Sequence, residues 1–386
     1  MHRPFKIALT ATFLGVLGLV GLQVVWPFLP AGAKLKGATE EPPAPKWTWV
    51  ALRRGEAFRA FDTWYEAHAG LRNFWVRLDS QVNFSVFYEV AFRGVGTQIV
   101  AGPHDWLFER HYIRDAVTPG RMTEAQLQAF ARRIRSVQDK LARLGVPFLL
   151  VVAPNKAEVY PEHAPAAYFA GRHPQEITTN FKRARPVFHA AGINFYDGPA
   201  RYAEWKRDGT RDLFARSGTH WSYDSAFRVL QDIRGQLNPR MRHPLPELKL
   251  TGRPVLEPQQ SDTDLMTMLN LFHSRLYEHP LPYSVPVPQI LVSDEQLPRL
   301  LLVHDSFGYV LIDLLYAARA VQSSASLYYF QNAYQQPGNV KTAIDVKTIE
   351  WQTFIKSYDA VIMVWTDIAF EHTGWGFFET LDRQLE

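Results

Sequence analysis

Two polar residues of this chain stand in positions that suit nucleophilic catalysis, and the first is Ser306. It lies between two apolar runs, 300–303 and 307–317, that have the character of a buried strand and a helix. A serine on such a turn gains from the helix N-terminus, whose free backbone N–H groups can stabilise a developing oxyanion. A helix N-cap favours serine for purely structural reasons, so the position alone leaves both roles open.

His220 is the residue that could serve as the base. It lies in the polar loop Ser217-Gly218-Thr219-His220-Trp221-Ser222, just ahead of a helix predicted over 224–237. Loops on a rigid α/β scaffold commonly carry catalytic groups, although a histidine is more often a structural residue bonded to backbone. If both loops leave the carboxyl edge of one sheet, Ser306 and His220 meet where α/β ligand sites form. That shared edge favours a catalytic pair.

The elements that must position these residues alternate between helix and strand. A helix over 123–144 opens at Thr123, steps its apolar residues by three or four and stops at Gly145. The unbroken apolar run 146–153 follows and is typical of a central parallel strand. Further segments are predicted as helices at 177–191 and 264–271, strands at 193–196, 300–303 and 360–364, and a hairpin over 98–108. The alternation predicts an α/β fold, a parallel sheet flanked by helices.

The N-terminal segment indicates a membrane anchor. Arg3 and Lys6 precede an apolar run from Ile7 to Leu29, long enough to span a bilayer. Ala31-Gly32-Ala33 is a weak cleavage site, so an uncleaved signal anchor over 1–33 is favoured over a signal peptide. A Pro-rich spacer over 34–46 and one extracytoplasmic domain over 47–386 complete the predicted organisation.

Composition excludes several function classes. The net charge of +4 comes from basic residues scattered along the chain, without the dense block that marks a nucleic-acid surface, so no nucleic-acid partner is expected. The absence of Cys excludes disulfides and thiolate chemistry, and it suits an oxidising compartment. No metal-ligand spacing, Walker loop or dinucleotide fingerprint is present, and neither a metal nor a cofactor is expected.

Several short motifs, taken in order, resemble the SGNH-hydrolase-like domain of the alginate O-acetyltransferase group, whose members acetylate secreted polysaccharides. The motifs that carry the resemblance are Gly102 to Phe108, Pro154-Asn155-Lys156 with Val159-Tyr160-Pro161, Thr219 to Ser222, Asp264-Leu265, and Asp305 to Phe307. The serine follows the histidine in the chain, as it does in that group. The resemblance covers most of the chain after the spacer and implies an SGNH-like, flavodoxin-like sheet.

The resemblance also implies a chemistry. Ser306 would attack an acyl carbonyl, His220 would take its proton, and an acetyl-serine would form. It further implies a polysaccharide acceptor, a membrane-bound acyl-relay partner, and a location in the bacterial inner membrane with the soluble domain in the periplasm. Among substrate contacts, Asn155 could donate to the oxyanion, Lys156 could meet an anionic sugar, and Trp221 could stack on a sugar ring. Weaker candidates are Trp365, Trp375, Glu371 and His372.

Two departures from the group's pattern bear on catalysis. Relatives usually carry Asp two residues before the histidine, where this chain has Gly218, and His304 replaces a glycine before the Asp-Ser pair. The missing acid is the group that holds the imidazole in its productive tautomer. Three accounts remain open. Another acid, Asp212, Asp224 or Asp305, orients His220; a backbone carbonyl does so; or the chain is a non-catalytic relative. Asp305, adjacent to the nucleophile, is the least suited orienter, although it is counted with Ser306 and His220 as catalytic.

The leading interpretation is an O-acetyltransferase that acts on a secreted or cell-wall polysaccharide. One alternative is an acetyl-esterase that uses the same Ser-His site, with water in place of a sugar hydroxyl. The other is a non-catalytic polysaccharide-binding or scaffold protein of an exopolysaccharide secretion complex.

Overall fold

A computed structural model describes residues 3–26, 34–37, 42–68, 70–90, 98–250, 254–257, 259–336 and 342–386. The chain divides into two compact units. One comprises Met1–Gln98 and Met266–Leu276, and the other comprises Ile99–Leu265 and Tyr277–Glu386. All the site residues predicted from the sequence belong to the second unit.

The first unit is helical. Its helices are α1 (Arg3–Val25), α2 (Trp49–Arg53), α3 (Glu56–His68), α4 (Arg72–Val82) and a π-helical turn at Asn83–Phe87. Helix α1 is long and apolar enough to cross a membrane, a property that a signal sequence shares. The cleavage candidate at 31–33 lies outside the described residues. The predicted boundaries of anchor, spacer and extracytoplasmic domain stay predictions.

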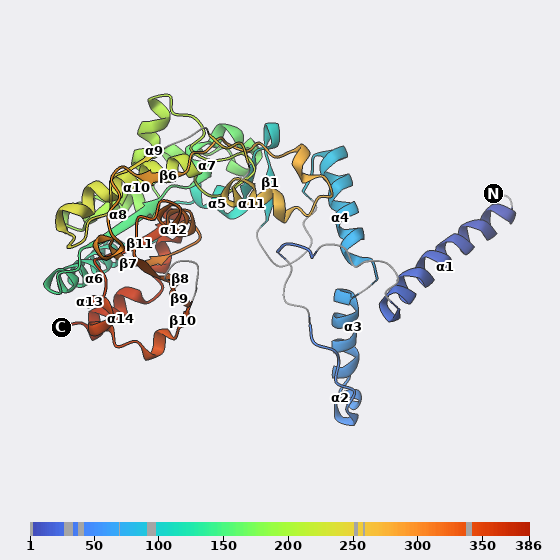
Figure 1. The fold of residues 1–386 in the computed structure, drawn as a ribbon. Coiled ribbons are helices and arrows are strands. Elements are labelled where there is room, and N and C mark those ends of the chain that lie inside the picture. Colours follow the sequence, from blue (N-terminus) through green and yellow to red (C-terminus); the bar gives the residue numbers. More distant parts are fainter. Residues whose placement is uncertain are drawn as a thin grey trace. The chain divides into compact units, whose positions relative to one another are not determined.

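The second unit is built on a mixed seven-stranded sheet of order β10-β9-β8-β7-β11-β3-β4 (Figure 1). Strands β8, β7, β11, β3 and β4 are parallel, and β9 and β10 extend the sheet antiparallel. The strands are β3 (Phe148–Ala153), β4 (Phe195–Asp197), β7 (Arg299–His304), β8 (Ser323–Tyr328), β9 (Asn332–Gln336), β10 (Thr342–Ile344) and β11 (Ala360–Thr366). The parallel core confirms the predicted fold class, and the antiparallel edge is an addition to it.

Residues along each central strand alternate between two buried cores, one on each face of the sheet. Leu149, Val151 and Leu302 face one core, while Leu150 and Val303 face the other. The helices are α5 (Arg110–Ala116), α7 (Lys156–Val159), α9 (Gly198–Arg207), α10 (Tyr223–Leu237) and α12 (Gly308–Ala317) on the first face, and α6 (Glu124–Arg143), α8 (Asn180–Ala190), α13 (Trp351–Lys356) and α14 (Phe377–Gln384) on the second. Burial on both faces explains why the central strands are uniformly apolar.

The predicted hairpin and first helix are confirmed. Strands β1 (Ile99–Ala101) and β2 (Leu107–Glu109) pair antiparallel, and a second short pair joins β5 (Leu248–Leu250) to β6 (Pro286–Pro288). Thr123 caps α6 through a capping box with Gln126, and Gly145 follows that helix at φ +76°. A residue in this left-handed region is how many helices end, and glycine enters it without steric cost.

Two elements differ from the sequence prediction. Strand β8 was not expected, because its serines hide the apolar pattern. They are nevertheless partnered in the sheet, since Ser324 lies 2.8 Å from the Tyr316 hydroxyl and Ser326 lies 2.6 Å from a ring nitrogen of His304. Helix α11 (Gln260–Met268) starts four residues before Asp264, the predicted first residue of this helix. The Asp264 carboxylate does not cap the helix, because it bonds to the distant loop that carries His220.

A buried lysine fixes the loop that carries His220. The Lys156 Nζ donates to the carbonyl oxygens of Leu107 (2.8 Å), Ala215 (2.7 Å), Arg216 (2.9 Å) and Gly218 (2.6 Å). Burial lowers the pKa of this amine to about 7, and the carboxylates of Asp264 and Glu109 oppose that fall. One side chain therefore joins the end of β3, the hairpin and the loop before His220.

The Lys156 amine has only carbonyl partners, and Trp106 and Phe108 flank it at 5.0 and 4.9 Å from their ring centroids. This differs from the expectation that Lys156 meets an anionic sugar. The physical reason is that the side chain is only 1% exposed, so no substrate reaches it in this structure.

Lys156→Met should lower the free energy of unfolding by about 3 kcal/mol or more, because four buried carbonyl oxygens lose their donor. It should also lower ester hydrolysis by the folded protein, because the loop before His220 is released. The matched control is Lys140→Met, since Lys140 donates to the Asp382 and Leu385 carbonyls on the other face of the sheet. Thermal unfolding and hydrolysis rates would be compared; unchanged hydrolysis by folded Lys156→Met would contradict this positioning role.

Candidate functional site

Ser306 follows β7 on a tight turn at the carboxyl edge of the sheet, as predicted. The turn is held by Asp305, whose Oδ1 accepts from the Phe307 N–H (2.9 Å) and whose Oδ2 accepts from the N–H (2.6 Å) and hydroxyl (3.0 Å) of Thr366 at the end of β11. Helix α12 starts two residues after Ser306. The half-buried serine therefore stands on a turn that is fixed to the neighbouring strand.

Asp305 acts on this turn and not on the imidazole. Burial raises its pKa to about 6, and the hydrogen bonds from Thr366 and Phe307 oppose that rise. Both carboxylate oxygens are occupied by these donors, and the charge of His220 acts on Asp305 only as a smaller effect. Its predicted place among the catalytic residues stays a prediction, and its contacts are those of a residue that positions Ser306.

His304 is a structural residue in the same turn. Its Nδ1–H donates to the Asp305 carbonyl (2.7 Å), and its Nε2 lies 2.6 Å from the Ser326 hydroxyl. Burial lowers the pKa of His304 to about 4, so the ring is neutral. A Cβ added to Gly308 would lie 2.6 Å from His304 Nδ1. The histidine thus fills the space over a glycine, which explains this departure from the family pattern.

His220 is held by an acid that the sequence did not single out. The Asp264 carboxylate contacts His220 Nδ1 through Oδ2, while its Oδ1 accepts from the Thr219 N–H (2.8 Å) and from its own helix at Leu265 (2.7 Å). Burial alone lowers the pKa of His220, but the charge and hydrogen bond of Asp264 outweigh it, so the pKa lies above its usual value. A carboxylate on Nδ1 fixes the tautomer that leaves Nε2 free to act as a base.

Gly218 is the position where relatives carry the acid, and its surroundings explain the exchange. A Cβ built on Gly218 would overlap the carbonyl oxygen of Ser261 in α11. The helix that supplies Asp264 therefore passes where any side chain at Gly218 would begin. The sequence did contain a signal, because Asp264 is the acid of one of the motifs that carry the family resemblance.

The acids considered as alternatives lie elsewhere. Asp212 and Asp224 line a small cavity of about 110 Å³ together with Asp262, and neither contacts His220 within the described ranges.

His220 and Ser306 share one corner of the sheet edge, where Phe307 lies between their loops. The ring centroids of His220 and Phe307 are 4.9 Å apart. His220 Nε2 is buried and has no hydrogen-bond partner in the described part of the chain, and no hydrogen bond joins it to Ser306 there. Catalytic hydrogen bonds are often long before substrate binds, so this arrangement is compatible with a resting pair.

Tyr329 is a further residue at the nucleophile that the sequence did not reveal. Burial together with the Asp305 charge raises the pKa of its phenol, and the nearby Ser306 side chain opposes that rise. The residue adopts φ +48°, a left-handed conformation that is uncommon for an aromatic residue. Its ring lies edge-on to the half-buried Trp375 at 5.1 Å. The β8–β9 turn thus brings a phenol close to the serine.

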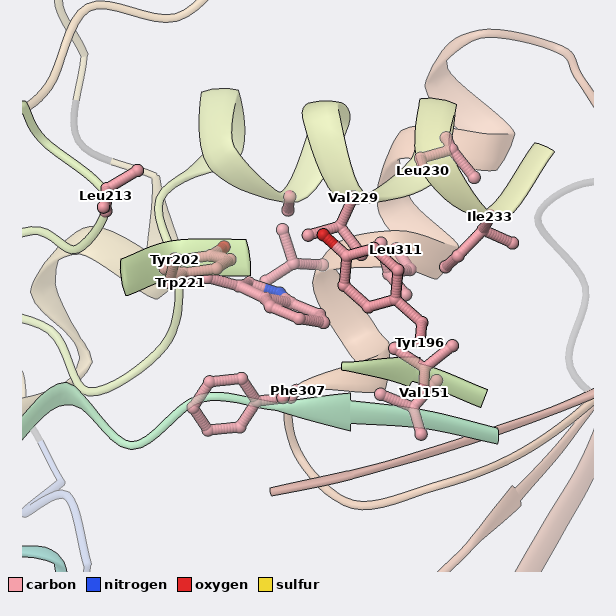
Figure 2. Packing of buried hydrophobic residues seen from close by; sticks show 14 of the residues in the cluster. Val151, Tyr196, Tyr202, Leu213, Trp221, Val229, Leu230, Ile233, Phe307 and Leu311 are labelled. Carbon is pink, nitrogen blue, oxygen red and sulfur yellow. The ribbon is translucent and has the colours of Figure 1, made fainter. Parts of the chain in front are cut away.

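Asn155 and Trp221 are both buried. Asn155 Nδ2 donates to the Tyr112 carbonyl (2.8 Å), and its Oδ1 accepts from the Ala157 N–H (2.8 Å). Its role at the oxyanion stays a prediction. Figure 2 shows the Trp221 indole between α10 and β3 with Phe307 beside it, the ring centroids of Trp221 and Phe307 being 5.3 Å apart. Trp221 is 0% exposed. This differs from the expected sugar-stacking surface, because the ring is part of the core.

The site offers serine, imidazole and carboxylate chemistry. The residues that the structure describes hold no group of three or more His, Asp and Glu side chains that could bind a metal ion. The arrangement can generate an alkoxide at Ser306, store its proton on His220 and stabilise the resulting imidazolium with Asp264.

Comparison with known proteins places the chain among acetyltransferases. A model of the SGNH hydrolase-like domain of acetyltransferase AlgX matches residues 99–309. The probable alginate O-acetylase AlgJ of Pseudomonas aeruginosa is 27% identical over 328 residues, which are 80% of this chain and 75% of that protein. The protein of the same name in Pseudomonas syringae pv. tomato is 26% identical over 72% of this chain and 65% of its own length.

Two solved structures are also similar. The O-acetyltransferase domain of Pseudomonas putida AlgJ has a TM-score of 0.44 and 18% identity over 75% of this chain and 99% of that one. Pseudomonas aeruginosa AlgX has a TM-score of 0.46 and 16% identity over 75% of this chain and 67% of that one.

The family match covers more than half of the chain. It confirms the resemblance drawn from the motifs, the SGNH-like fold class and the acetyltransferase class of enzyme. The chain belongs to the family of the SGNH hydrolase-like domain of acetyltransferase AlgX.

Proposed function

We propose that this protein is an O-acetyltransferase that modifies a secreted or cell-wall polysaccharide through an acetyl-Ser306 intermediate. The observation that carries the proposal is the His220–Asp264 pair with a free Nε2, beside a serine turn fixed by Asp305. In this proposal Asp264 is the orienting acid. The glycine at position 218, where relatives carry that acid, had favoured the interpretation of a non-catalytic relative. The names of the relatives, probable alginate O-acetylases, support a polysaccharide as the acceptor.

The reaction divides into two balanced half-reactions. The Ser306 Oγ attacks the acetyl carbonyl of an ester or thioester donor while its proton passes to His220 Nε2. The tetrahedral intermediate collapses to acetyl-serine, and the donor leaves with the proton from His220. A sugar hydroxyl then attacks the acetyl-serine, its proton passes to Nε2, and the Ser306 oxygen leaves and recovers that proton. Water in place of the sugar would give esterase activity.

Three groups assist these steps. Asp264 stabilises the imidazolium that exists while the proton is on His220. The backbone N–H of Ser306, which makes no hydrogen bond among the described residues, lies near the start of α12 and is suited to the oxyanion. Tyr329, whose phenol lies close to the Ser306 side chain, would orient the serine hydroxyl in the resting state.

The proposed setting follows from the anchor and the donor. Helix α1 would hold the catalytic domain at the outer side of the bacterial inner membrane, in the periplasm. Acetyl donors made in the cytoplasm do not reach that side, so a membrane-bound relay partner would deliver the acetyl group. The organisation of anchor over 1–33, spacer over 34–46 and domain over 47–386 is part of this proposal.

Ser306→Ala and His220→Ala should each abolish hydrolysis of a chromogenic acetyl ester by the full-length protein, with the rate falling about a thousandfold or more. Incubation of the parent with an acetyl ester and rapid acid quench should add one acetyl group to the peptide containing Ser306, detected by mass spectrometry. Activity that survives in both variants would exclude the pair as the site. Residual binding of polysaccharide without turnover by the parent would instead favour the scaffold alternative.

Asp264→Asn should lower the turnover number by about a hundredfold to ten-thousandfold, because the imidazolium loses its counter-charge. The base must be neutral, so the parent's rate rises with pH through the His220 pKa, which Asp264 raises above its usual value. Removing the carboxylate lowers that pKa, and the acidic limb of the residual activity should move to lower pH. Asp224→Asn is the matched control, and a limb that stays in place in Asp264→Asn would contradict the assignment.

Gly218→Ala should lower both stability, by about 1–3 kcal/mol, and ester hydrolysis, because its Cβ overlaps the Ser261 carbonyl and displaces the start of α11. Gly235→Ala is the control. A Cβ there meets nothing within 4 Å, and the position lies inside α10, so alanine should stabilise the fold slightly. Full activity in Gly218→Ala would mean that Asp264 does not depend on this close approach.

A further inference from the structure

A polar cavity of about 460 Å³ lies at the carboxyl ends of β3 and β11. Asn155 and Glu158 reach it from the segment after β3, and Asp367, the residue directly after β11, reaches it from the next strand. Asn180 and Glu371, which are bonded to each other at 2.7 Å, line it from α8 and the turn after β11. Apart from Asn155, none of these residues has a role in the Ser306 and His220 machinery.

The strand register places this cavity next to the nucleophile. Strand β11 lies between β7 and β3, and Val364 pairs with His304 while Thr366 pairs with Ala153. Thr366 also donates twice to Asp305, the residue before Ser306. Neighbouring strands lie about 4.8 Å apart. The cavity wall at Asp367 therefore begins one strand and one residue away from the serine turn.

Two carboxyl groups form the inner wall, that of the buried Asp367 and that of the largely buried Glu158. Asp367 is 8% exposed, and its Oδ1 is buried without a hydrogen-bond partner among the residues described. Glu158 is close enough for its charge to act on Asp367, its Oε1 is likewise without a hydrogen-bond partner among the described residues, and Lys182 Nζ lies 3.4 Å from that oxygen. A buried acceptor without a donor is costly, so a native structure is expected to supply one from water or a ligand.

The protonation state of this pair suits a ligand that both donates and accepts. Burial raises the pKa of Asp367 well above its usual value, and the charge of Glu158 raises it further. Burial also raises the pKa of Glu158, which Lys182 opposes. Two such neighbours favour a state in which one carboxyl keeps a proton. A protonated carboxyl donates and a carboxylate accepts, which is the complement of a sugar hydroxyl.

We propose that this cavity is the acceptor subsite, which binds an uncharged sugar unit of the polysaccharide through its hydroxyl groups, with Asp367 and Glu158 as the principal contacts. The proposal rests on the proposed acetyl transfer at Ser306. A unit held here lies one strand from Ser306, so a hydroxyl of that unit or of its neighbour in the polymer can reach the acetyl-serine.

The charges at the cavity favour an uncharged unit over a uronate. Four carboxyl groups line it, those of Asp115, Glu158, Asp367 and Glu371, against two guanidinium groups. One of these, Arg114, already pairs with Asp115 at 3.2 Å. An added carboxylate would enter an environment with an excess of acidic groups, whereas hydroxyl groups meet the acceptors that they need.

The test is binding to the full-length Ser306→Ala protein, in which no transfer occurs. Cellohexaose is the uncharged probe and a mannuronic acid hexamer the charged one. In that background Asp367→Asn and Glu158→Gln should each raise the Kd for cellohexaose about tenfold or more, the loss expected when a charged acceptor is removed. Glu371→Ala, a change at an exposed lining residue that spares the core, should weaken binding in the same direction.

Asp359→Asn is the matched control. Asp359 is equally buried at the opposite end of β11, where it accepts from the Arg299 N–H at 2.9 Å, so its loss tests stability without touching the cavity. Ester hydrolysis by Asp359→Asn with Ser306 intact, and cellohexaose binding by Asp359→Asn in the Ser306→Ala background, should each stay within about twofold of the parent protein, because Asp359 lines neither the cavity nor the serine turn. Unchanged cellohexaose binding in Asp367→Asn and Glu371→Ala, or tighter binding of the charged hexamer, would overturn the proposal. Binding that depends on Asp367 with no acetylation at Ser306 would support the subsite while refuting the proposed reaction.

Discussion

The site depends on the buried amine of Lys156 and the four carbonyl oxygens that surround it. An amine at this depth is stable only when its N–H groups are all bonded, and here the acceptors come from the hairpin and the loop before His220. One acceptor is the Gly218 carbonyl, and Gly218 is also where α11 makes its close approach. Lys156 thus fixes Gly218, Gly218 packs against the start of α11, and α11 carries the Asp264 that bonds to His220. The helix, the loop and the strand end are therefore placed by one another.

In the proposed mechanism the orienting acid comes from a different segment of the chain than in the family pattern. In the family pattern the acid and the base are two residues apart, whereas here 44 residues separate His220 from Asp264. The requirement is a carboxylate on Nδ1, and chain order does not enter it. An acid at position 218 is incompatible with this packing of α11, because only glycine there leaves room for the Ser261 carbonyl. Gly218 thus argues for a working site in this chain, although its sequence context favoured a decayed one.

The fold was largely predictable because the central strands are buried on both faces and therefore have unbroken apolar sequences, as at 148–153 and 360–366. The positions of Ser306 and His220 at the sheet edge followed from the same pattern. Strand β8 was not predictable, since its buried serines are paired only by tertiary contacts. Asp264, Tyr329 and the burial of Lys156 and Trp221 were missed for a related reason. Each depends on which loops meet in space, and local composition carries no information on that.

The charges around His220 suit a group that must both accept and return a proton. Asp264 raises the imidazole pKa against the effect of burial, and the more distant carboxylates of Glu109 and Asp305 act in the same direction. A stronger base takes the Ser306 or sugar proton more readily, but a smaller fraction of it is neutral near pH 7. Glu109 contributes little to this loss of neutral imidazole, because burial raises the pKa of Glu109 and the charge of His111 only partly opposes the rise. A carboxyl with a raised pKa carries less negative charge at a given pH than an exposed glutamate does, so Glu109 raises the imidazole pKa less than it otherwise would.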